Sequence, residues 1–207
     1  MRGDLTLLPS ALTEGAPRGE VELVADAEHL PRVVRDGMLA ARVSLDIATA
    51  DFKAMLVPKS HGTPAGGGRG GRHAPSIITH LLRLARRGVE VRVLHAGVPS
   101  GPALSELKKT LARYPDIPLT IRRCPRLHAK AVVVDAERLY LGSANLTGAG
   151  LGAKGPTRRN FEWGVISQTP ELIDAVLGRY NALWEGQHCA GCGRRDVCPV
   201  PLEEPRL

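Results

Sequence analysis

The sequence predicts an α/β fold in which helices cover both sides of a mixed β-sheet. Short apolar segments alternate along the chain with longer amphipathic ones, which is typical of layered α/β domains. At 207 residues the chain suits one domain with a sizeable core and a small appendage. Only 3% of the residues are aromatic, so we expect aliphatic side chains to form that core.

The first third of the chain contains two predicted strands and one helix. Residues 1–19 are punctuated by Pro and Gly and predict a loose N-terminal lead. A short strand is expected at 21–24 and an alternating one at 43–50, while apolar residues at helical spacing predict a helix over 30–41. The Gly-rich segment 58–75 cannot pack a core, so it predicts a flexible insertion.

The rest of the chain alternates regularly between strands and helices. Ser76 is a favourable N-cap for a helix that Gly88 would end. The elements predicted from here on are helix 76–87, strand 89–94, helix 102–113, strands 119–122, 131–134, 139–141 and 162–167, and helix 170–184. We therefore predict one main domain over residues 20–185 and a Cys-rich tail over 186–207.

Nothing in the sequence indicates a membrane span. No apolar run approaches the ~20 residues that a spanning helix needs. The N-terminus, MRGDLTLLPSAL, makes a poor signal peptide because an acidic residue and Pro9 interrupt its short apolar stretch. We therefore expect a cytoplasmic protein, in which disulfides are unusual.

The basic charge is concentrated in one segment. The net charge of the chain is +7, and residues 121–160 contribute +6 of it. The segment holds two acidic residues, Asp135 and Glu137, and eight basic ones: Arg122, Arg123, Arg126, Lys130, Arg138, Lys154, Arg158 and Arg159. Such a cluster attracts polyanions, so it favours a polyanionic substrate over a neutral one.

Four polar residues in this segment stand at informative spacings. His128 and Lys130 precede a short apolar strand, and Ser143 and Asn145 follow the next one. A turn beginning at Asp135 would make the two strands a hairpin, and residues two apart in a strand share a face. The hairpin would thus bring an imidazole, an ammonium and two neutral hydrogen-bonding groups to one point, as a phosphate site requires.

The segment HAKAVVVDAERLYLGSAN resembles the HKD signature of the phospholipase D superfamily, H-x-K-x4-D-x6-G-S-x-N. Asn160-Phe161-Glu162 resembles the N-x-E element that follows this signature. Because the chain has one such motif, it is most similar to the single-motif, bacterial nuclease-like branch. The resemblance implies a layered α/β/α fold with a mixed central sheet.

The resemblance also implies a phosphodiesterase that forms a covalent phosphohistidine on His128 and needs no cofactor for catalysis. Lys130 and Asn145 would bind the equatorial phosphate oxygens, and Ser143 would add a hydrogen bond. Glu162 would accept a bond from the imidazole. Asp135 and Gly142 are expected to be structural.

Lys154, Arg158 and Arg159 lie between the motif and Asn160. They could bind a substrate backbone, or they could be solvated loop charges, and the sequence leaves both open.

One motif provides one imidazole, whereas the reaction needs a second one to protonate the leaving group. A twofold-symmetric homodimer with one composite site is the simplest source. The alternative acid within the chain is His95, which follows the strand predicted at 89–94.

The tail predicts a structural metal site. Cys189, Cys192 and Cys198 are spaced as C-x2-C-x5-C, and Cys124 or His188 could supply a fourth ligand. Zinc would take four such ligands. The spacing also resembles the terminal cysteine cluster of some iron–sulfur nucleases, in which a far upstream cysteine, here Cys124, completes the set. The alternative is reduced thiols without a metal.

Three functions are compatible with these features: a nuclease acting on DNA or RNA, a phospholipase D acting on phospholipid head groups, and a nucleic-acid-binding module that has lost activity. The basic cluster favours the first. The second would have the same chemistry on a membrane lipid, but the chain has no basic amphipathic helix for docking to a bilayer. The third is disfavoured because every motif position is present.

Overall fold

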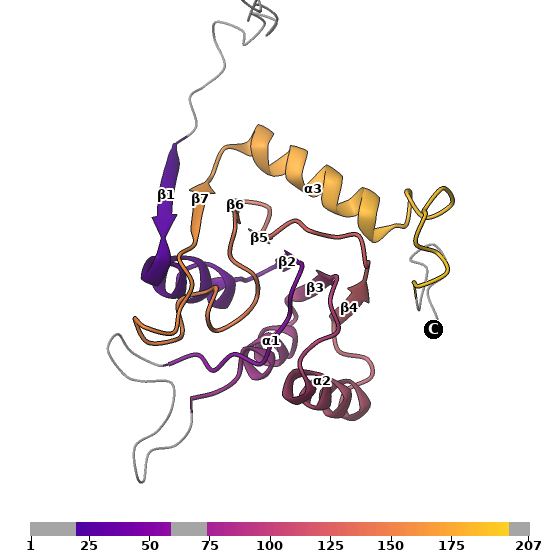
Figure 1. Ribbon diagram of the computed structural model, residues 1–207, viewed down its shortest axis with the longest axis horizontal. Coiled ribbons are helices and arrows are strands. Elements are labelled where there is room, and N and C mark those ends of the chain that lie inside the picture. The colour runs from indigo at the N-terminus through magenta and orange to yellow at the C-terminus, as the bar shows by residue number, and fades with distance from the viewer. Residues whose placement is uncertain (1–19, 59–73, 199–207) are drawn as a thin grey trace, which may run out of the picture.

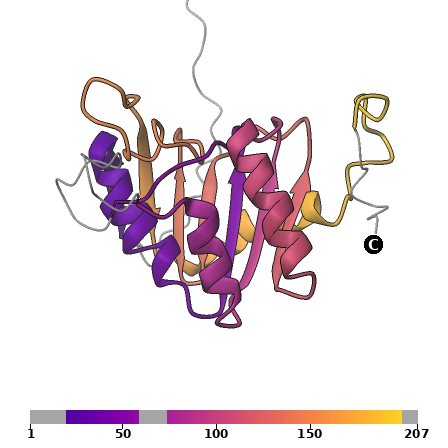
Figure 2. The ribbon, with the colours of Figure 1, turned by 90° about the horizontal axis from the view of Figure 1, so that it is seen from below.

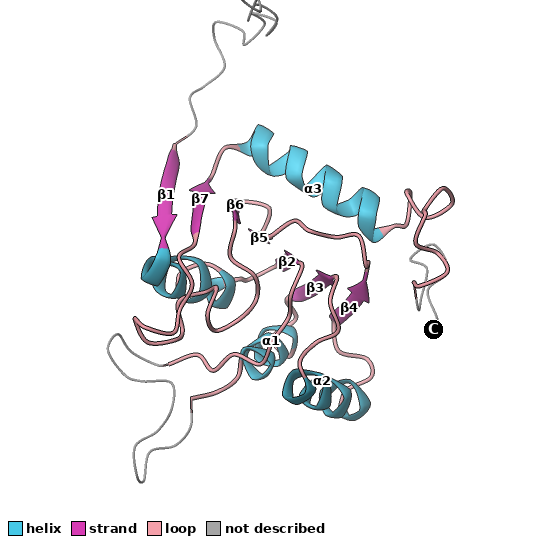
Figure 3. Ribbon diagram, viewed as in Figure 1, coloured by secondary structure: helices cyan, strands magenta, loops and turns pink. Residues whose placement is uncertain are grey.

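A seven-stranded mixed sheet with helices on both faces forms the molecule (Figures 1 and 3). The computed structural model describes residues 20–58 and 74–198. The predicted loose lead 1–19, most of the insertion 58–75 and the end of the tail therefore lie outside the described residues. The predicted α/β class is confirmed.

Every predicted strand is present within one residue of its expected ends. The sheet order is β1-β7-β6-β5-β2-β3-β4. The strands are β1 (Val21–Ala25), β2 (Ser44–Thr49), β3 (Glu90–His95), β4 (Leu119–Arg123), β5 (Ala131–Val134), β6 (Arg138–Gly142) and β7 (Trp163–Ser167).

The connections explain which strands are parallel. β2, β3 and β4 run parallel, because α1 (Ile77–Ala85) and α2 (Gly101–Arg113) return the chain to the same end of the sheet. The other pairs are antiparallel. β5 and β6 form the predicted hairpin, whose turn holds Asp135 and Ala136 at φ of 54° and 53°.

The two faces of the sheet have separate cores (Figures 1 and 2). One core lies under α1, α2 and the N-terminal helical segment and includes Val34, Phe52 and Ile78. The other lies under α3 (Pro170–Trp184) and includes Val133 and Ile173. In the part of the chain that the structure describes, no helix has the length and apolarity that a membrane span needs.

The helix predicted over 30–41 forms in two pieces. A π-helical segment, η2 (His29–Arg35), is followed by a short 3-10 turn, η3 (Met38–Ala40), and preceded by another, η1 (Asp26–Glu28). A Cβ at Gly37 would collide with the Val33 carbonyl oxygen, so the tight backbone here depends on glycine. The Asp36 amide bonds the Pro31 carbonyl, five residues back, at 2.9 Å.

Asp135 ties the hairpin turn to the start of β2. Its carboxylate accepts hydrogen bonds from the backbone amides of Arg42 (3.0 Å), Val43 (2.8 Å) and Ser44 (2.9 Å). Burial tends to raise the pKa of this carboxyl, but the three amides outweigh it and lower the pKa below its ordinary 3.8.

After α3 the tail folds back toward the loop before β5. Cys124 and Cys189 both pack against the second core. The Arg126 Nη1 donates to Cys192 Sγ at 3.6 Å, and the backbone amide of Arg194 together with this guanidinium lowers the pKa of the Cys192 thiol. Among the described residues, no three His, Cys, Asp or Glu side chains gather as metal ligands, so the metal site stays a prediction from the sequence.

Removing the Asp135 carboxylate should destabilise the fold. We expect Asp135→Ala to lower the free energy of unfolding by about 1–3 kcal/mol, because three backbone donors lose a charged acceptor. Asp135→Asn should cost less, since it keeps one acceptor oxygen and tolerates a positive φ. Because the folded pKa is depressed, this stabilisation is present above pH 3.8 and is lost as the pH falls through the folded pKa. Urea unfolding of the wild type, Asp135→Ala and Asp135→Asn at several pH values tests this prediction. Equal free energies of unfolding for the three proteins would contradict it.

Elemental analysis of anaerobically purified protein tests the predicted tail site. We expect zinc, or iron with sulfide, near one site per chain, because thiolates close in sequence bind metal as the tail orders. Cys192→Ser should release the metal, and loss of it in Cys124→Ser would identify the fourth ligand. Metal-free protein whose tail thiols all react with a thiol reagent would refute the site.

Candidate active site

The β5–β6 hairpin brings the two halves of the motif together. The Gly142 amide donates to the Lys130 carbonyl at 3.1 Å, which continues the ladder one step past Ala131 opposite Leu141. The segment 128–130 therefore lies beside 143–145 at one end of the hairpin. Both segments lie just outside the strands, so the alternation of faces expected from strand geometry does not extend to them.

His128 and Lys130 are in direct contact. The Lys130 Nζ lies 3.2 Å from each imidazole nitrogen of His128 and donates to its carbonyl oxygen at 2.7 Å. His128 is exposed and Lys130 half-buried. Partial burial lowers the pKa of Lys130, while the negative charge of Glu162 opposes this shift. The site thus presents an accessible imidazole with an ammonium against it.

Glu162 is buried, and side chains near the motif satisfy its charge. Its carboxylate accepts hydrogen bonds from the Ser143 hydroxyl and from Asn160 Nδ2, the latter at 2.9 Å. Ser143 also pairs with Trp163, since its amide donates to the Trp163 carbonyl at 2.9 Å and its hydroxyl accepts from the Trp163 amide at 3.1 Å. Ser143 is therefore fixed between its own strand end and the start of β7.

Asn145 is held by the loop after β2. Its Oδ1 accepts from the Asp51 amide at 2.9 Å. The Thr49 hydroxyl lies 3.3 Å from the same oxygen and 2.8 Å from the Asp51 carbonyl, which is the closer acceptor for its single proton. Thr49, which is 1% exposed, in turn accepts from the Leu146 amide at 2.9 Å. With Oδ1 engaged in this way, the amide nitrogen of Asn145 is left as the group that can donate to a ligand.

Asp135 and Glu162 differ in how far their contacts match the roles expected of them. Asp135 bonds backbone amides on the far side of the hairpin, as a structural residue would. Glu162, by contrast, was expected to accept a bond from the imidazole. Within the described residues of one chain, its partners are Ser143 and Asn160, and no hydrogen bond joins it to His128.

The three predicted substrate-binding cations lie in the loop before Asn160. Lys154 and Arg158 are exposed and Arg159 is half-buried. The backbone amides of Arg158 and Arg159 both bond the Gly155 carbonyl, at 2.9 and 3.1 Å. The loop is therefore compact, and its charges are available to solvent or to a polyanion.

His95 has a structural environment. It is 5% exposed, its Nδ1 hydrogen-bonds the Gly97 carbonyl at 2.8 Å, and its ring meets Phe52 edge-on. Burial lowers its pKa. A proton donor that is buried, already bonded and kept neutral is a poor general acid.

Sequence reasoning missed the residues that support the motif from a distance. Besides Thr49 and Asp51, these are Asp26, which bonds the Glu162 backbone, and Tyr140, whose hydroxyl meets the Ala144 amide. They are far from the motif in sequence or hidden within a strand, so spacing gave no signal. Asp26 and Asp51, acidic residues just after predicted strands, could have been suspected on that ground.

Comparisons with known proteins agree with this geometry. The family model described as "Cardiolipin synthase, PLD-like domain" matches residues 68–184, more than half of the chain. A comparison with curated proteins gave no match.

Solved structures show the same fold. Nuc from Salmonella typhimurium, a phospholipase D family member, is similar at 21% identity and a TM-score of 0.55, covering 81% of this chain and 95% of its own. NucT from Helicobacter pylori is similar at 15% identity and a TM-score of 0.54, with 81% and 96% covered. A polyphosphate kinase from Porphyromonas gingivalis is similar at 15% identity and a TM-score of 0.50, with 90% of this chain and 27% of the kinase chain covered. The sequence match over most of the sheet, together with the shared fold, shows that this chain belongs to the family of phospholipase D-like domains.

Proposed function

We propose that this protein is a phosphodiesterase that works through a covalent phosphohistidine on His128 and acts on nucleic acid. The observation that carries the proposal is the accessible imidazole in contact with the Lys130 ammonium, beside Ser143 and the buried Glu162. Nucleophile, cation and hydrogen-bond donors stand within one loop cluster, as displacement at phosphorus requires.

The reaction has two displacements. In the first, an imidazole nitrogen of His128 bonds to phosphorus, and the bond from phosphorus to the leaving oxygen breaks. A second imidazole gives that oxygen a proton. In the second, this imidazole takes a proton from water, whose oxygen displaces the nitrogen of His128 from phosphorus. Lys130 and the Asn145 amide nitrogen would stabilise the charge on the non-bridging oxygens throughout.

Charge favours a nucleic acid as the substrate. The segment 121–160 contributes +6 of the net +7, and it contains the motif and the loop with Lys154, Arg158 and Arg159. Exposed cations next to a reactive phosphate site would hold the adjoining phosphates of a polynucleotide. The alternative is a phospholipase D, which the description of the matching family model favours. An inactive binding module is disfavoured by the contact between His128 and Lys130.

An apolar face that the described residues leave exposed supports a homodimer. Leu23 and Leu141 both pair with Val165, so β1, β7 and β6 present these side chains on one face. This face of the sheet is the one that α3 covers elsewhere. Leu139 points to the same face as Leu141, two residues later, and Leu139 packs in the core under α3. Leu23 is 68% exposed and Trp163, on the same face, 70%. A face of this kind suits a second copy of the chain.

The site itself gives a reason for the dimer. Trp163 pairs with Ser143 through its backbone, so the apolar face borders the motif. Glu162 bonds Ser143 and Asn160 rather than its own His128. Its carboxylate does not bond the imidazole of its own chain, so in a dimer the expected bond would go to the imidazole of the second copy, and the pair of chains would supply both imidazoles.

The chemistry is tested with single- and double-stranded DNA, RNA and phosphatidylcholine vesicles as substrates. We expect cleavage of nucleic acid that persists in EDTA while the fold stays intact, because His128 supplies the nucleophile. His128→Ala should abolish cleavage and prevent labelling by a radioactive phosphodiester. Strict dependence on added Mg²⁺ would contradict the mechanism, and turnover of phosphatidylcholine alone would favour the lipid alternative.

Light scattering tests the dimer. We expect about twice the chain mass of 22.1 kDa, and a shift to monomer with loss of activity in Leu23→Glu, because a charge would be buried in the interface. Val43→Glu is the matched control, since Val43 is 69% exposed but lies just before β2, away from this face. A fully active monomer would contradict the composite site.

A further inference from the structure

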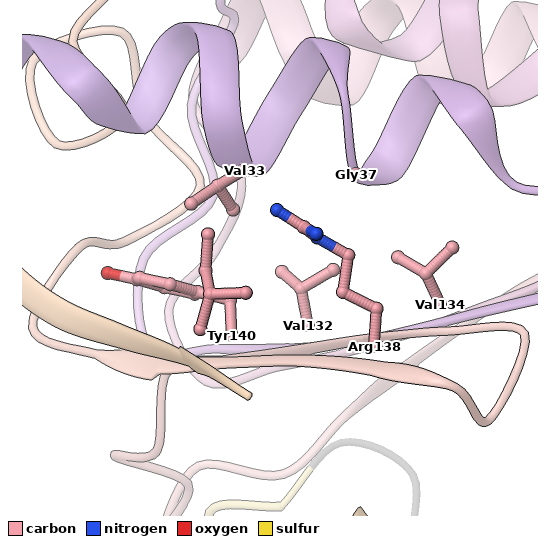
Figure 4. Close-up of a pocket in the computed structure, with 7 residues that line it drawn as sticks. Val33, Gly37, Val132, Val134, Arg138 and Tyr140 are labelled. Carbon is pink, nitrogen blue, oxygen red and sulfur yellow. The ribbon is translucent and has the colours of Figure 1, made fainter. Parts of the chain in front are cut away.

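A buried tyrosine–histidine pair lies directly behind the motif. Tyr140 is 3% exposed and its hydroxyl accepts a hydrogen bond from the Ala144 amide at 3.3 Å. Ala144 stands between the two motif side chains Ser143 and Asn145. Figure 4 shows the Tyr140 ring between the sheet and the helical segment that carries Val33. The tyrosine therefore bonds the backbone of the motif from the core side.

The Asp26 carbonyl fixes the hydrogen-bond directions in this pair. A carbonyl oxygen can only accept, so His29 Nδ1, 3.0 Å from it, carries a proton. In a neutral imidazole Nε2 then accepts from the Tyr140 hydroxyl at 2.9 Å, while the Tyr140 oxygen accepts from the Ala144 amide. The network thus assigns a neutral imidazole with hydrogen on Nδ1. Burial agrees with this, since it lowers the pKa of His29 and raises that of Tyr140 to about 12.

The same network reaches the other half of the site. The Asp26 amide donates to the Glu162 carbonyl at 2.8 Å, and the Glu162 amide donates to Asp26 Oδ1 at 3.0 Å. Asp26 adopts a φ of 45°, an uncommon conformation for a residue other than glycine. A continuous chain of bonds therefore runs from Ala144 through Tyr140, His29 and Asp26 to Glu162.

Two glycines are explained by the same pair. A Cβ at Gly142 would collide with the Tyr140 hydroxyl, and a Cβ at Gly164 would collide with its ring. These glycines are opposite each other in β6 and β7. A Cβ at the motif glycine would thus meet the phenol, and it would also collide with the Gly164 Cα and the Trp163 carbonyl oxygen of β7.

We propose that Tyr140 and His29 are positioning residues, which fix Ser143, Asn145 and Glu162 relative to His128 through backbone bonds. The inference rests on the proposed phosphodiesterase function. Neither residue touches the substrate. Their contribution is to prevent the 143–145 segment and Glu162 from shifting during the displacement, where small misplacements are costly.

The test compares single variants on bis-p-nitrophenyl phosphate, a simple phosphodiester, at a temperature where all are folded. Tyr140→Phe keeps the ring and removes the hydroxyl, and we expect kcat to fall about ten- to hundredfold with little change in KM. We expect a similar fall in kcat for His29→Leu. In His29→Gln the amide oxygen can accept from the Tyr140 hydroxyl, so most of the wild-type kcat should be retained. The double variant Tyr140→Phe/His29→Leu should be no slower than either single one, because both break one chain of bonds.

Tyr180→Phe is the matched control. Tyr180 is also a buried tyrosine, but it belongs to α3 and packs in the core on the other face of the sheet from Tyr140. Within the described residues its hydroxyl has no hydrogen-bond partner. Its loss should leave kcat unchanged. A Tyr140→Phe variant as fast as wild type, or a Tyr180→Phe variant equally slow, would overturn the inference.

Amide hydrogen exchange separates this inference from the proposed function. Exchange over 143–146 and 160–163 should be faster in Tyr140→Phe and His29→Leu than in wild type or Tyr180→Phe. Unchanged exchange would overturn the positioning role whatever the activity. Wild-type protein that cleaves no phosphodiester would instead refute the proposed function.

Discussion

The hydrogen bond from the Gly142 amide to the Lys130 carbonyl is the contact on which the site depends. It continues the β5–β6 ladder beyond its last strand pair and so sets His128 and Lys130 beside Ser143 and Asn145. Because side chains alternate along a strand, a slip of one residue in this hairpin would turn the β6 side chains to the opposite faces. The register is secured from behind, where Tyr140 packs against Gly142 and Gly164, and at the turn, where Asp135 bonds the amides before β2.

The positive and negative charges of the site differ in their exposure to solvent. The cations and the imidazole are exposed or half-buried, whereas Glu162 is 7% exposed. A buried carboxylate is costly unless hydrogen bonds satisfy it, and here a hydroxyl and an amide do so. The negative charge therefore stays close enough to offset part of the lowering of the Lys130 pKa by burial, without an ion pair between the two side chains. A cationic surface above a fixed internal carboxylate is a favourable setting for binding an anion and orienting an imidazole.

Much of this architecture could be predicted from the sequence, because local signals agree with the fold. Each strand carries its own apolar pattern, and Ser76 indeed caps α1 by accepting the Thr79 amide at 3.0 Å. The motif brought its own residues together because it is a single hairpin. What could not be predicted depends on contacts between distant segments. The π-helical form of His29–Arg35 has no signal in the local apolar spacing, which fits an ordinary helix equally well. The supports of Asn145 and Glu162 come from Asp51 and Asp26, which lie 94 and 136 residues away.

The pairing of the first strand with the last has a consequence for synthesis of the chain. Among the strands of residues 20–58 and 74–198, β1 lies at the edge of the sheet and pairs with β7 alone, with Val21 opposite Ser167. During translation, β1 leaves the ribosome with its backbone groups unpaired and Leu23 exposed, and it keeps them so until residue 167 has followed. Such long-range pairing is slow and leaves partly folded chains prone to association. Asp26, just after β1, can bond Glu162 only once that part of the chain has been made. A chain that has not yet been synthesised as far as β7 therefore cannot hold the proposed site in its assembled form.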